Sequence, residues 1–478
     1  MSSLLPQLLT PMADLLATSA FAKSYHGATT IDPAGAVAIA LLLALTVLLP
    51  RTLILLPLVL GMCFVPVGQR LVIATVDLPI LRLLIMAALV RLIAYGEHRT
   101  FKLHTLDLWV IVWACIMLVF GSINGSSAVR WLGGTFDTLG AYFVARLYFQ
   151  GAPDFGRLGR VLAIVVMPVA LLLVYEKLSG RSPFGFFTGV ADIADTRFGK
   201  VRARGAFIHP IICGSFMAVA FPIIATQLWH KGWRTLAAVG MVCCGAGILA
   251  CASSGPILAL AAGLWAVAVL PWRRWTMTLR WSGFATLVVL HFAMEAPVWH
   301  LLSRISISKG STGWHRYHLI DQWIKHSHEW LLTGSSKGTA HWGSQLFDVT
   351  NHYVGISLTS GLLGLALFVL LMFMGWFGIG RKMRVLEVDV RNAEDESERR
   401  QLRYQRLIVW VAGALLFQHA VAFVGVSYFG QMTTFFWITF GAIASLGIHP
   451  VAAVSLQRKP NPSTQQPEQT MVFEEVPA

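Results

Sequence analysis

A polar segment, residues 295–352, carries the side chains best suited to chemistry on a polar substrate. It lies between two long apolar stretches and holds seven of the chain's 15 histidines and five of its 17 tryptophans. Imidazole and carboxylate groups can take a proton from an attacking hydroxyl, and a guanidinium can stabilise a departing anion. The segment stands where an apolar region ends, which is where a lipid-linked substrate would present its head group. The residues that could act there are His315, Arg316, Asp348, Asn351 and His352.

Three of these side chains are candidates for the catalytic base: His315, Asp348 and His352. The histidines also raise the alternative of a metal site, because imidazole binds several transition metals. His326 and His328, however, lack the HExxH spacing of zinc-dependent hydrolases. We therefore expect a reaction that uses neither a metal nor another cofactor.

A second polar segment, residues 178–206, is basic. Short loops on the outer side of a bilayer are normally poor in Lys and Arg, so an excess of them indicates a bound anion. Paired arginines can form bidentate hydrogen bonds to phosphate oxygens, although they can also reach for lipid head groups. The charged residues of this segment are Arg181, Arg197, Lys200, Arg202 and Arg204 against Asp192 and Asp195.

We expect Arg202, Arg204 and Arg316 to contact phosphate groups. Other polar residues at the ends of apolar runs are secondary candidates for contacts to phosphate or sugar, and Glu176 is also an alternative base. These secondary candidates are Arg146, Glu176, His209 and Asn351.

The composition determines the class of protein. The chain is 56% hydrophobic and 13% charged, and its apolar runs repeatedly approach the length that crosses a bilayer. We predict an all-α polytopic membrane protein with 12 to 14 transmembrane helices. The thirteen apolar windows are 35–50, 52–67, 75–95, 105–122, 131–149, 160–177, 206–228, 234–252, 254–271, 277–294, 353–378, 406–424 and 431–448.

The short loops rich in Lys and Arg fall on one side, which the positive-inside rule assigns to the cytoplasm. This pattern explains the net charge of +14 without a nucleic-acid partner. The chain then divides into an N-terminal interfacial segment (1–34), one transmembrane domain (35–448) and a disordered cytoplasmic tail (449–478). Within the domain, the basic loop (178–206) and the large, partly helical loop (295–352) lie outside, and a charged connector (379–406) lies in the cytoplasm.

The order of these features resembles the O-antigen ligase and polysaccharide polymerase superfamily of bacterial envelope proteins, over roughly residues 75–445. Each motif is short, and their order around one large outer loop makes the likeness more specific. The stretches that carry it are Asp137-Thr-Leu-Gly-Ala-Tyr-Phe-Val-Ala-Arg146, Arg204-Gly-Ala-Phe-Ile-His209-Pro210, Ser253-Ser254-Gly255, and Asp348-Val-Thr-Asn351-His352-Tyr353 followed by Gly361-Leu-Leu-Gly364.

The resemblance implies a GT-C-like glycosyltransferase fold and an inverting, metal-independent glycosyl transfer at the periplasmic face of the bacterial inner membrane. The donor would be a glycan on undecaprenyl pyrophosphate, and the acceptor a hydroxyl group of a second glycan. Arg204 and Arg316 would stabilise the departing diphosphate, and a flippase and a chain-length regulator would be possible partners.

One departure from the ligase pattern concerns the base. Counting back from Gly361 and Gly364 places Thr350 where ligases have histidine and Asn351 where they have asparagine, so His352 is displaced by two residues. The sequence is more similar to exopolysaccharide-type members, in which Asp-Val-Thr-Asn replaces His-Asn. This similarity favours a polymerase and makes Asp348 a rival base.

Three alternatives remain from the sequence. A ligase that transfers the glycan to lipid A core would use the same chemistry. A transporter, either a flippase of lipid-linked glycan or an anion carrier, would often show inverted repeats, and we find no convincing repeat. A non-catalytic scaffold of an envelope complex would tolerate loss of Arg204 and Arg316.

Overall fold

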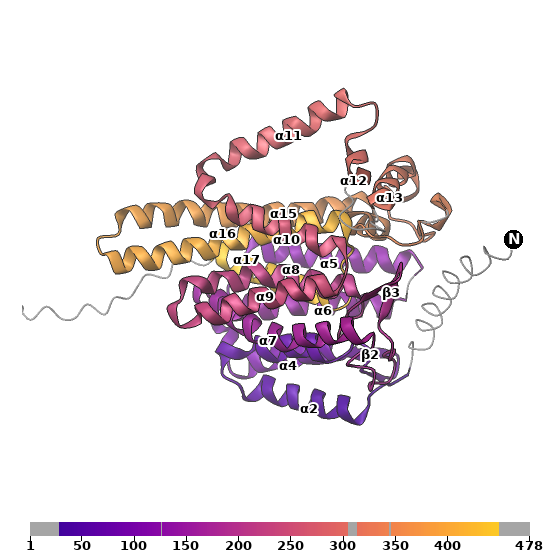
Figure 1. Cartoon of the computed structure of the whole chain (residues 1–478), viewed down its shortest axis with the longest axis horizontal. Helices are drawn as coiled ribbons and strands as arrows, with labels where there is room; N and C mark the ends of the chain where they lie inside the picture. The colour runs from indigo at the N-terminus through magenta and orange to yellow at the C-terminus, as the bar shows by residue number, and fades with distance from the viewer. Residues whose placement is uncertain (1–27, 126, 305–312, 344–345, 449–478) are drawn as a thin grey trace, which may run out of the picture.

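The computed structural model describes residues 28–125, 127–304, 313–343 and 346–448. Most of the predicted N-terminal segment, the predicted cytoplasmic tail and residues 305–312 of the large loop lie outside this described part. The described chain is mainly helical, as predicted, with two short β-hairpins that the hydrophobic pattern did not indicate. Most of the long helices run along one common axis (Figure 1).

The longer helices, in chain order, are α2 (Pro33–Leu48), α3 (Leu55–Phe64), α4 (Ile80–Ala94), α5 (Thr105–Ile123), α6 (Ala128–Tyr148), α7 (Ala152–Ser179), α8 (Pro210–Ala225), α9 (Arg234–Ala250), α10 (Ser254–Ala268), α11 (Thr276–Ala293), α15 (His352–Asn392), α16 (Glu396–Gly425) and α17 (Gln431–Ile448). The large loop contains α12 (Leu301–Arg304), α13 (Gly313–Lys325) and α14 (Ser327–Trp330). The antiparallel hairpins are β1 (Arg70–Ile73) with β2 (Val76–Pro79), and β3 (Asp195–Arg197) with β4 (Lys200–Arg202).

Every predicted apolar window overlaps one of these helices. Taken singly, 7 helices of the described chain are long and apolar enough to cross a bilayer. The number rises to 8 if α10 and the following segment Leu270–Ala293, which bend by 77° at their junction, form one span. The protein is therefore a membrane-embedded helical bundle.

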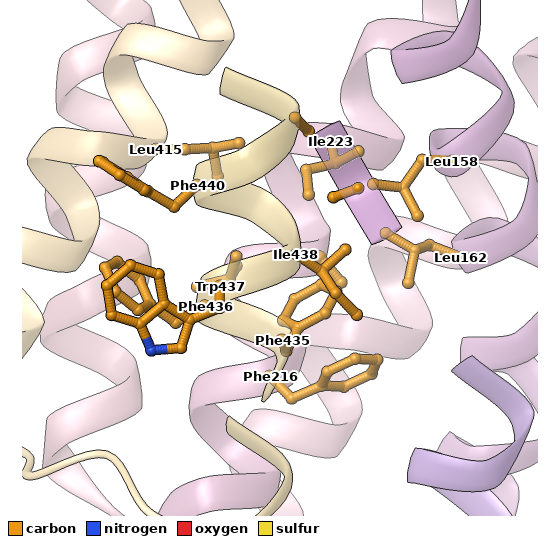
Figure 2. Close-up of a cluster of buried hydrophobic side chains, with 14 of the residues drawn as sticks. Leu158, Leu162, Phe216, Ile223, Leu415, Phe435, Phe436, Trp437, Ile438 and Phe440 are labelled. Carbon is orange, nitrogen blue, oxygen red and sulfur yellow. The ribbon is translucent and has the colours of Figure 1, made fainter. Parts of the chain in front are cut away.

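Helix α17 lies inside this bundle, and most of its residues are buried. Figure 2 shows Phe435 and Ile438 of α17 on the side of Phe216 in α8, whereas Phe436 and Trp437 point to the other side. A helix that is apolar on all faces is expected in such a position. Its packing fixes the short turn that joins it to α16.

The charged connector predicted at residues 379–406 is mostly helical. α15 and α16 continue through it and leave only residues 393–395 between them. Glu, Arg and Leu are good helix formers, and a pair such as Glu396 and Arg399, 3.1 Å apart, adds support at i,i+3 spacing. The two helices form the long hairpin at the left of Figure 1.

At its other end α15 is interrupted. Ser360 and Gly361 leave helical geometry, and the φ of 65° at Gly361 belongs to the left-handed region that favours glycine. Leu362 N–H donates to the carbonyl of Leu331 in the large loop, so the first turns of α15 pack against that loop. The predicted span at 353–378 is therefore broken near its start, at the bundle end that carries the large loop, which we call the loop end.

Candidate functional site

The basic loop is built on the end of α7 and the approach to α8. Gly180 (φ 69°) ends α7, and Gly205 (φ 58°) turns the chain after the β3–β4 hairpin. Glycine adopts these left-handed angles without the strain that other residues incur. The result is that Arg204 lies beside Glu176, near the end of α7.

Glu176 holds this turn. Its Oε2 accepts the backbone N–H groups of Arg204 at 3.2 Å and Gly205 at 2.8 Å. The residue is buried, and its other oxygen, Oε1, has no hydrogen-bond partner in the described part of the chain. The sugar contact or base role stays a prediction, whereas the observed contacts fix the backbone that presents Arg204.

The guanidinium groups of Arg202 and Arg204 have few hydrogen-bond or ion-pair partners in the described part of the protein. Arg202 is buried, lies 3.4 Å from Asp195, and has an Nε–H without an acceptor among the described residues. Burial lowers the pKa of Arg202, although the Asp195 carboxylate opposes this effect. Arg204 is half-buried, and we find no hydrogen bond from its guanidinium to any residue that the structure describes. Both side chains have donors available to an anion.

His209 caps helix α8. Its Nδ1 accepts the N–H of Ile211 at 3.2 Å, which satisfies one of the free amides at the helix start. Burial, and then the positive charges of Arg202 and Arg204, lower the pKa of His209 to about 4. The ring is therefore neutral at pH 7 and carries its proton on Nε2. It can donate a hydrogen bond to a ligand, but its Nδ1 is occupied.

In the large loop, α13 places Arg316 against the end of α16. Only 5% of Arg316 is exposed, and its Nε–H has no acceptor among the described residues. A Cβ at Gly425 would lie 3.0 Å from that Nε, so the glycine leaves room for the guanidinium. Burial lowers the pKa of Arg316, and the positive charge of Arg197 acts in the same direction. A buried guanidinium with an unused N–H donor is suited to bind an anion.

The contact between His315 and Asp348 determines which ring nitrogen of His315 can act as a base. His315 Nε2 lies 3.0 Å from the backbone carbonyl oxygen of Asp348, so Nε2 must carry the proton. The neutral ring then has its lone pair on Nδ1, which is free to accept a proton. The side chain of Asp348 is exposed, and it has no hydrogen bond within the described ranges. Both residues retain the capacity of a base.

His352 and Asn351 are more fully engaged by the fold. His352 Nδ1 accepts the N–H of Tyr428 at 3.3 Å, which places the proton of the neutral ring on Nε2 and leaves a donor. Asn351 caps α15 by accepting the N–H groups of Tyr353 and Val354, and its amide donates to the carbonyl of Val424. His352 as base and Asn351 as a substrate ligand stay predictions, but both side chains already have structural contacts.

The turn between α16 and α17, residues 426–430, connects the two loops. On one side, the ring of Phe429 lies 6.1 Å from the ring of His209. On the other side, Tyr428 donates to His352. The start of α8, which follows the basic loop, and the start of α15 therefore contact the same short turn.

Gln431 and Arg197 provide two further links. Gln431, the first residue of α17, accepts the N–H of Ile208 and donates to the carbonyl of Ala206 at 3.0 Å. Arg197, in β3, is close enough for its charge to act on Arg316. The predicted cationic residues of the two loops thus share the loop end of the bundle.

Arg146 lies elsewhere. It is buried and forms an ion pair with Asp107, with Nε to Oδ1 at 3.0 Å, and Tyr142 donates to the same oxygen. Asp107 is near the start of α5, whereas Asn124, just after α5, bonds to the large loop at the carbonyl of Thr333. At 1.5 Å per residue these positions are about 25 Å apart. The structure does not bring Arg146 to the other candidates, and its charge is neutralised where it stands.

A cavity of about 380 Å³ adjoins the site, between α5, α6, α15, α17 and the turn 426–430. His352 and Tyr428 form part of its wall. None of the described residues that line it is Asp, Glu, Lys or Arg. Its volume falls within the range typical of small-molecule sites, roughly 300–1,000 Å³.

The sequence did not single out several residues of this site. Arg197 stands out in the sequence only as part of the basic cluster. Gln431 falls at the start of the predicted window 431–448, and Tyr428 lies between two predicted windows. One available signal was the polar stretch Ser427-Tyr428 between two long apolar runs, and Gly425 and Gly430 flank it. Their partners are distant in the chain, so local pattern could not show the contacts.

Within the described ranges, no group of three or more His, Cys, Asp or Glu residues is placed to hold a metal ion. His341 instead contacts Glu329 at 2.6 Å, and His326 stacks on Trp342. Comparison with models of protein families and with curated proteins found no match to this chain.

Proposed function

We propose that this protein is a polymerase that joins undecaprenyl-pyrophosphate-linked oligosaccharide repeat units into a bacterial surface polysaccharide. The observation that carries the proposal is the buried Arg316, whose guanidinium has an unused donor and lies near the basic loop. Arginines with unused N–H donors suit a diphosphate, because each charge-assisted bond is worth about 1.5–3 kcal/mol.

In the proposed reaction, a hydroxyl oxygen of the acceptor glycan attacks the anomeric carbon of the donor sugar. The bond between that carbon and the pyrophosphate oxygen breaks, and configuration inverts. Arg204, Arg202 and Arg316 stabilise the negative charge that develops on the leaving lipid pyrophosphate. The acceptor's proton passes to a base, for which the free Nδ1 of His315 and the exposed carboxylate of Asp348 are better placed than His352.

The proposal includes a GT-C-like fold, 12 to 14 spans and a loop end that faces the periplasm. It requires no metal. The lipid donor and the glycan acceptor are its substrates, and a flippase and a chain-length regulator are its proposed partners in the inner membrane.

The test is incubation of the purified protein with a defined undecaprenyl-pyrophosphate oligosaccharide, with and without chelator. We expect longer glycans and free undecaprenyl pyrophosphate in both samples, and no turnover by Arg316→Gln. Arg304→Gln, an exposed arginine of the same loop, is the matched control and should remain active. Absence of glycan growth in the wild-type sample would contradict the proposal, and activity that chelator abolishes would contradict its metal independence.

A deletion in cells separates a polymerase from a ligase. We expect cells that lack the protein to accumulate single repeat units. Continued synthesis of long polymer without its attachment to an acceptor would instead identify a ligase.

A further inference from the structure

The cavity beside the site has an unusual wall for a membrane-embedded region. Its lining is aromatic and hydroxylated, and no charged side chain of the described chain reaches it. Trp113, Trp131 and Trp437 come from three different helices and contribute flat ring faces. Such faces carry negative potential and attract polarised C–H and N–H groups.

Neither of two indole N–H groups in this wall is open to a ligand. That of Trp113 bonds to the carbonyl of Gly364 at 3.0 Å, and that of Trp131 is fully buried, with its ring against Gly121. These two tryptophans therefore offer ring faces, not hydrogen-bond donors, to a molecule in the cavity.

Hydroxyl groups add to the polar character of the wall. Thr359 donates to the carbonyl of Gly355, and the hydroxyl of Tyr428 contacts His419. An alkyl chain would leave the other hydroxyls without partners, and a phosphate would find no cation to balance its charge. An uncharged ring with several hydroxyl groups would supply hydrogen-bond partners for the wall and would need no cation. The hydroxylated lining residues, besides Tyr428, are Thr135, Thr138, Thr359, Ser427 and Thr433.

We propose that this cavity is a subsite for an uncharged sugar ring of the lipid-linked glycan, an inference that rests on the proposed function. Arg316 packs against Gly425, and the cavity wall begins two residues later at Ser427. The phosphates held by the arginines and the sugar held by the cavity would then be neighbours, as they are in a sugar-pyrophosphate lipid.

Glycine positions give a sharp test. Gly134 lines the cavity, and a Cβ built there meets no atom within 4 Å, so a side chain can begin there and Gly134→Leu adds volume at the cavity wall. Gly283 in α11 is equally open and does not line the cavity, so Gly283→Leu is the matched control. Both changes improve helix propensity. Trp131→Phe keeps a flat ring but reduces the ring face that lines the cavity.

The probes are undecaprenyl pyrophosphate with and without one attached glucose, with binding to the full-length protein measured in nanodiscs. We expect the wild type and Gly283→Leu to bind the glucose-bearing lipid about tenfold more tightly, an advantage of about 1.4 kcal/mol. Gly134→Leu should lose this preference and keep its affinity for the bare lipid, and Trp131→Phe should retain only part of it.

Equal affinity of the wild type for both lipids would overturn the sugar subsite and leave the proposed function intact. If Gly134→Leu weakens both lipids equally, the cavity holds the isoprenoid chain instead, which also overturns the inference. If neither lipid binds the wild type, the proposed function fails and the subsite with it.

Discussion

Arg316 is the residue on which function and stability make opposite demands. A guanidinium that is 95% buried by area, with an unused donor, is costly in the absence of an anion. We expect Arg316→Met to raise the free energy of unfolding by about 1 kcal/mol or more, since an apolar group replaces a buried charge. Thermal unfolding in detergent measures this change. A loss of several kcal/mol would show instead that Arg316 holds the large loop in place.

His209 gives a pH dependence with a definite sign. An unfolded histidine takes up a proton near pH 6.5, whereas folded His209 stays neutral until about pH 4. Stability therefore falls as pH decreases through this window, by up to about 3 kcal/mol at its lower end. In His209→Asn, which can still cap α8, the fall between pH 6.5 and 4 should be smaller. An equal fall in stability between pH 6.5 and 4 in both proteins would contradict this account.

At the scale of elements, substitutions of Asn351 distinguish its role as a helix cap from a role in substrate binding. Asn351→Ala should lower the stability of the protein by about 1 kcal/mol, because two amides at the start of α15 lose their acceptor. Asn351→Ser can cap and should restore both stability and glycan turnover. Recovery of stability without recovery of turnover would indicate that Asn351 contacts the substrate.

The limits of prediction also appear at this scale. The apolar windows located each long helix because hydrophobic length is a local property. The hairpin β3–β4 and the break at Gly361 depend on backbone angles that hydropathy does not report. Arg146 looked available because its partner, Asp107, is 39 positions away on another helix, while Asp137 pairs instead with Arg82. Residue type singles out the arginines as a group, but only packing shows which of them are left without partners.

For the whole molecule, the account requires the loop end and the α15–α16 hairpin to lie on opposite sides of the membrane. Lys200, in β4, and Glu394, between α15 and α16, are exposed. In a Cys115→Ser background, which removes the exposed native thiol, Lys200→Cys should react with a membrane-impermeant maleimide in cells with a permeabilised outer membrane. Glu394→Cys should react only after the inner membrane is opened. The reverse pattern would place the site in the cytoplasm and contradict the proposed reaction.

The second feature of the whole molecule is the position of helix α11. It stands away from the other helices in Figure 1, and none of its residues is buried in the protein. A helix with this composition requires lipid on most of its surface. The site is therefore carried by the tightly packed helices around α17, and substitutions on α11 serve as controls.

The central claim is that the loop end binds a lipid pyrophosphate through Arg316. Its most direct test is the affinity of the full-length protein for undecaprenyl pyrophosphate, compared between the wild type, Arg316→Gln and the control Arg304→Gln. The account predicts that Arg316→Gln binds about 10- to 100-fold more weakly, as expected for the loss of one charge-assisted contact, and that Arg304→Gln binds as the wild type does. Equal affinity in all three proteins would contradict the claim.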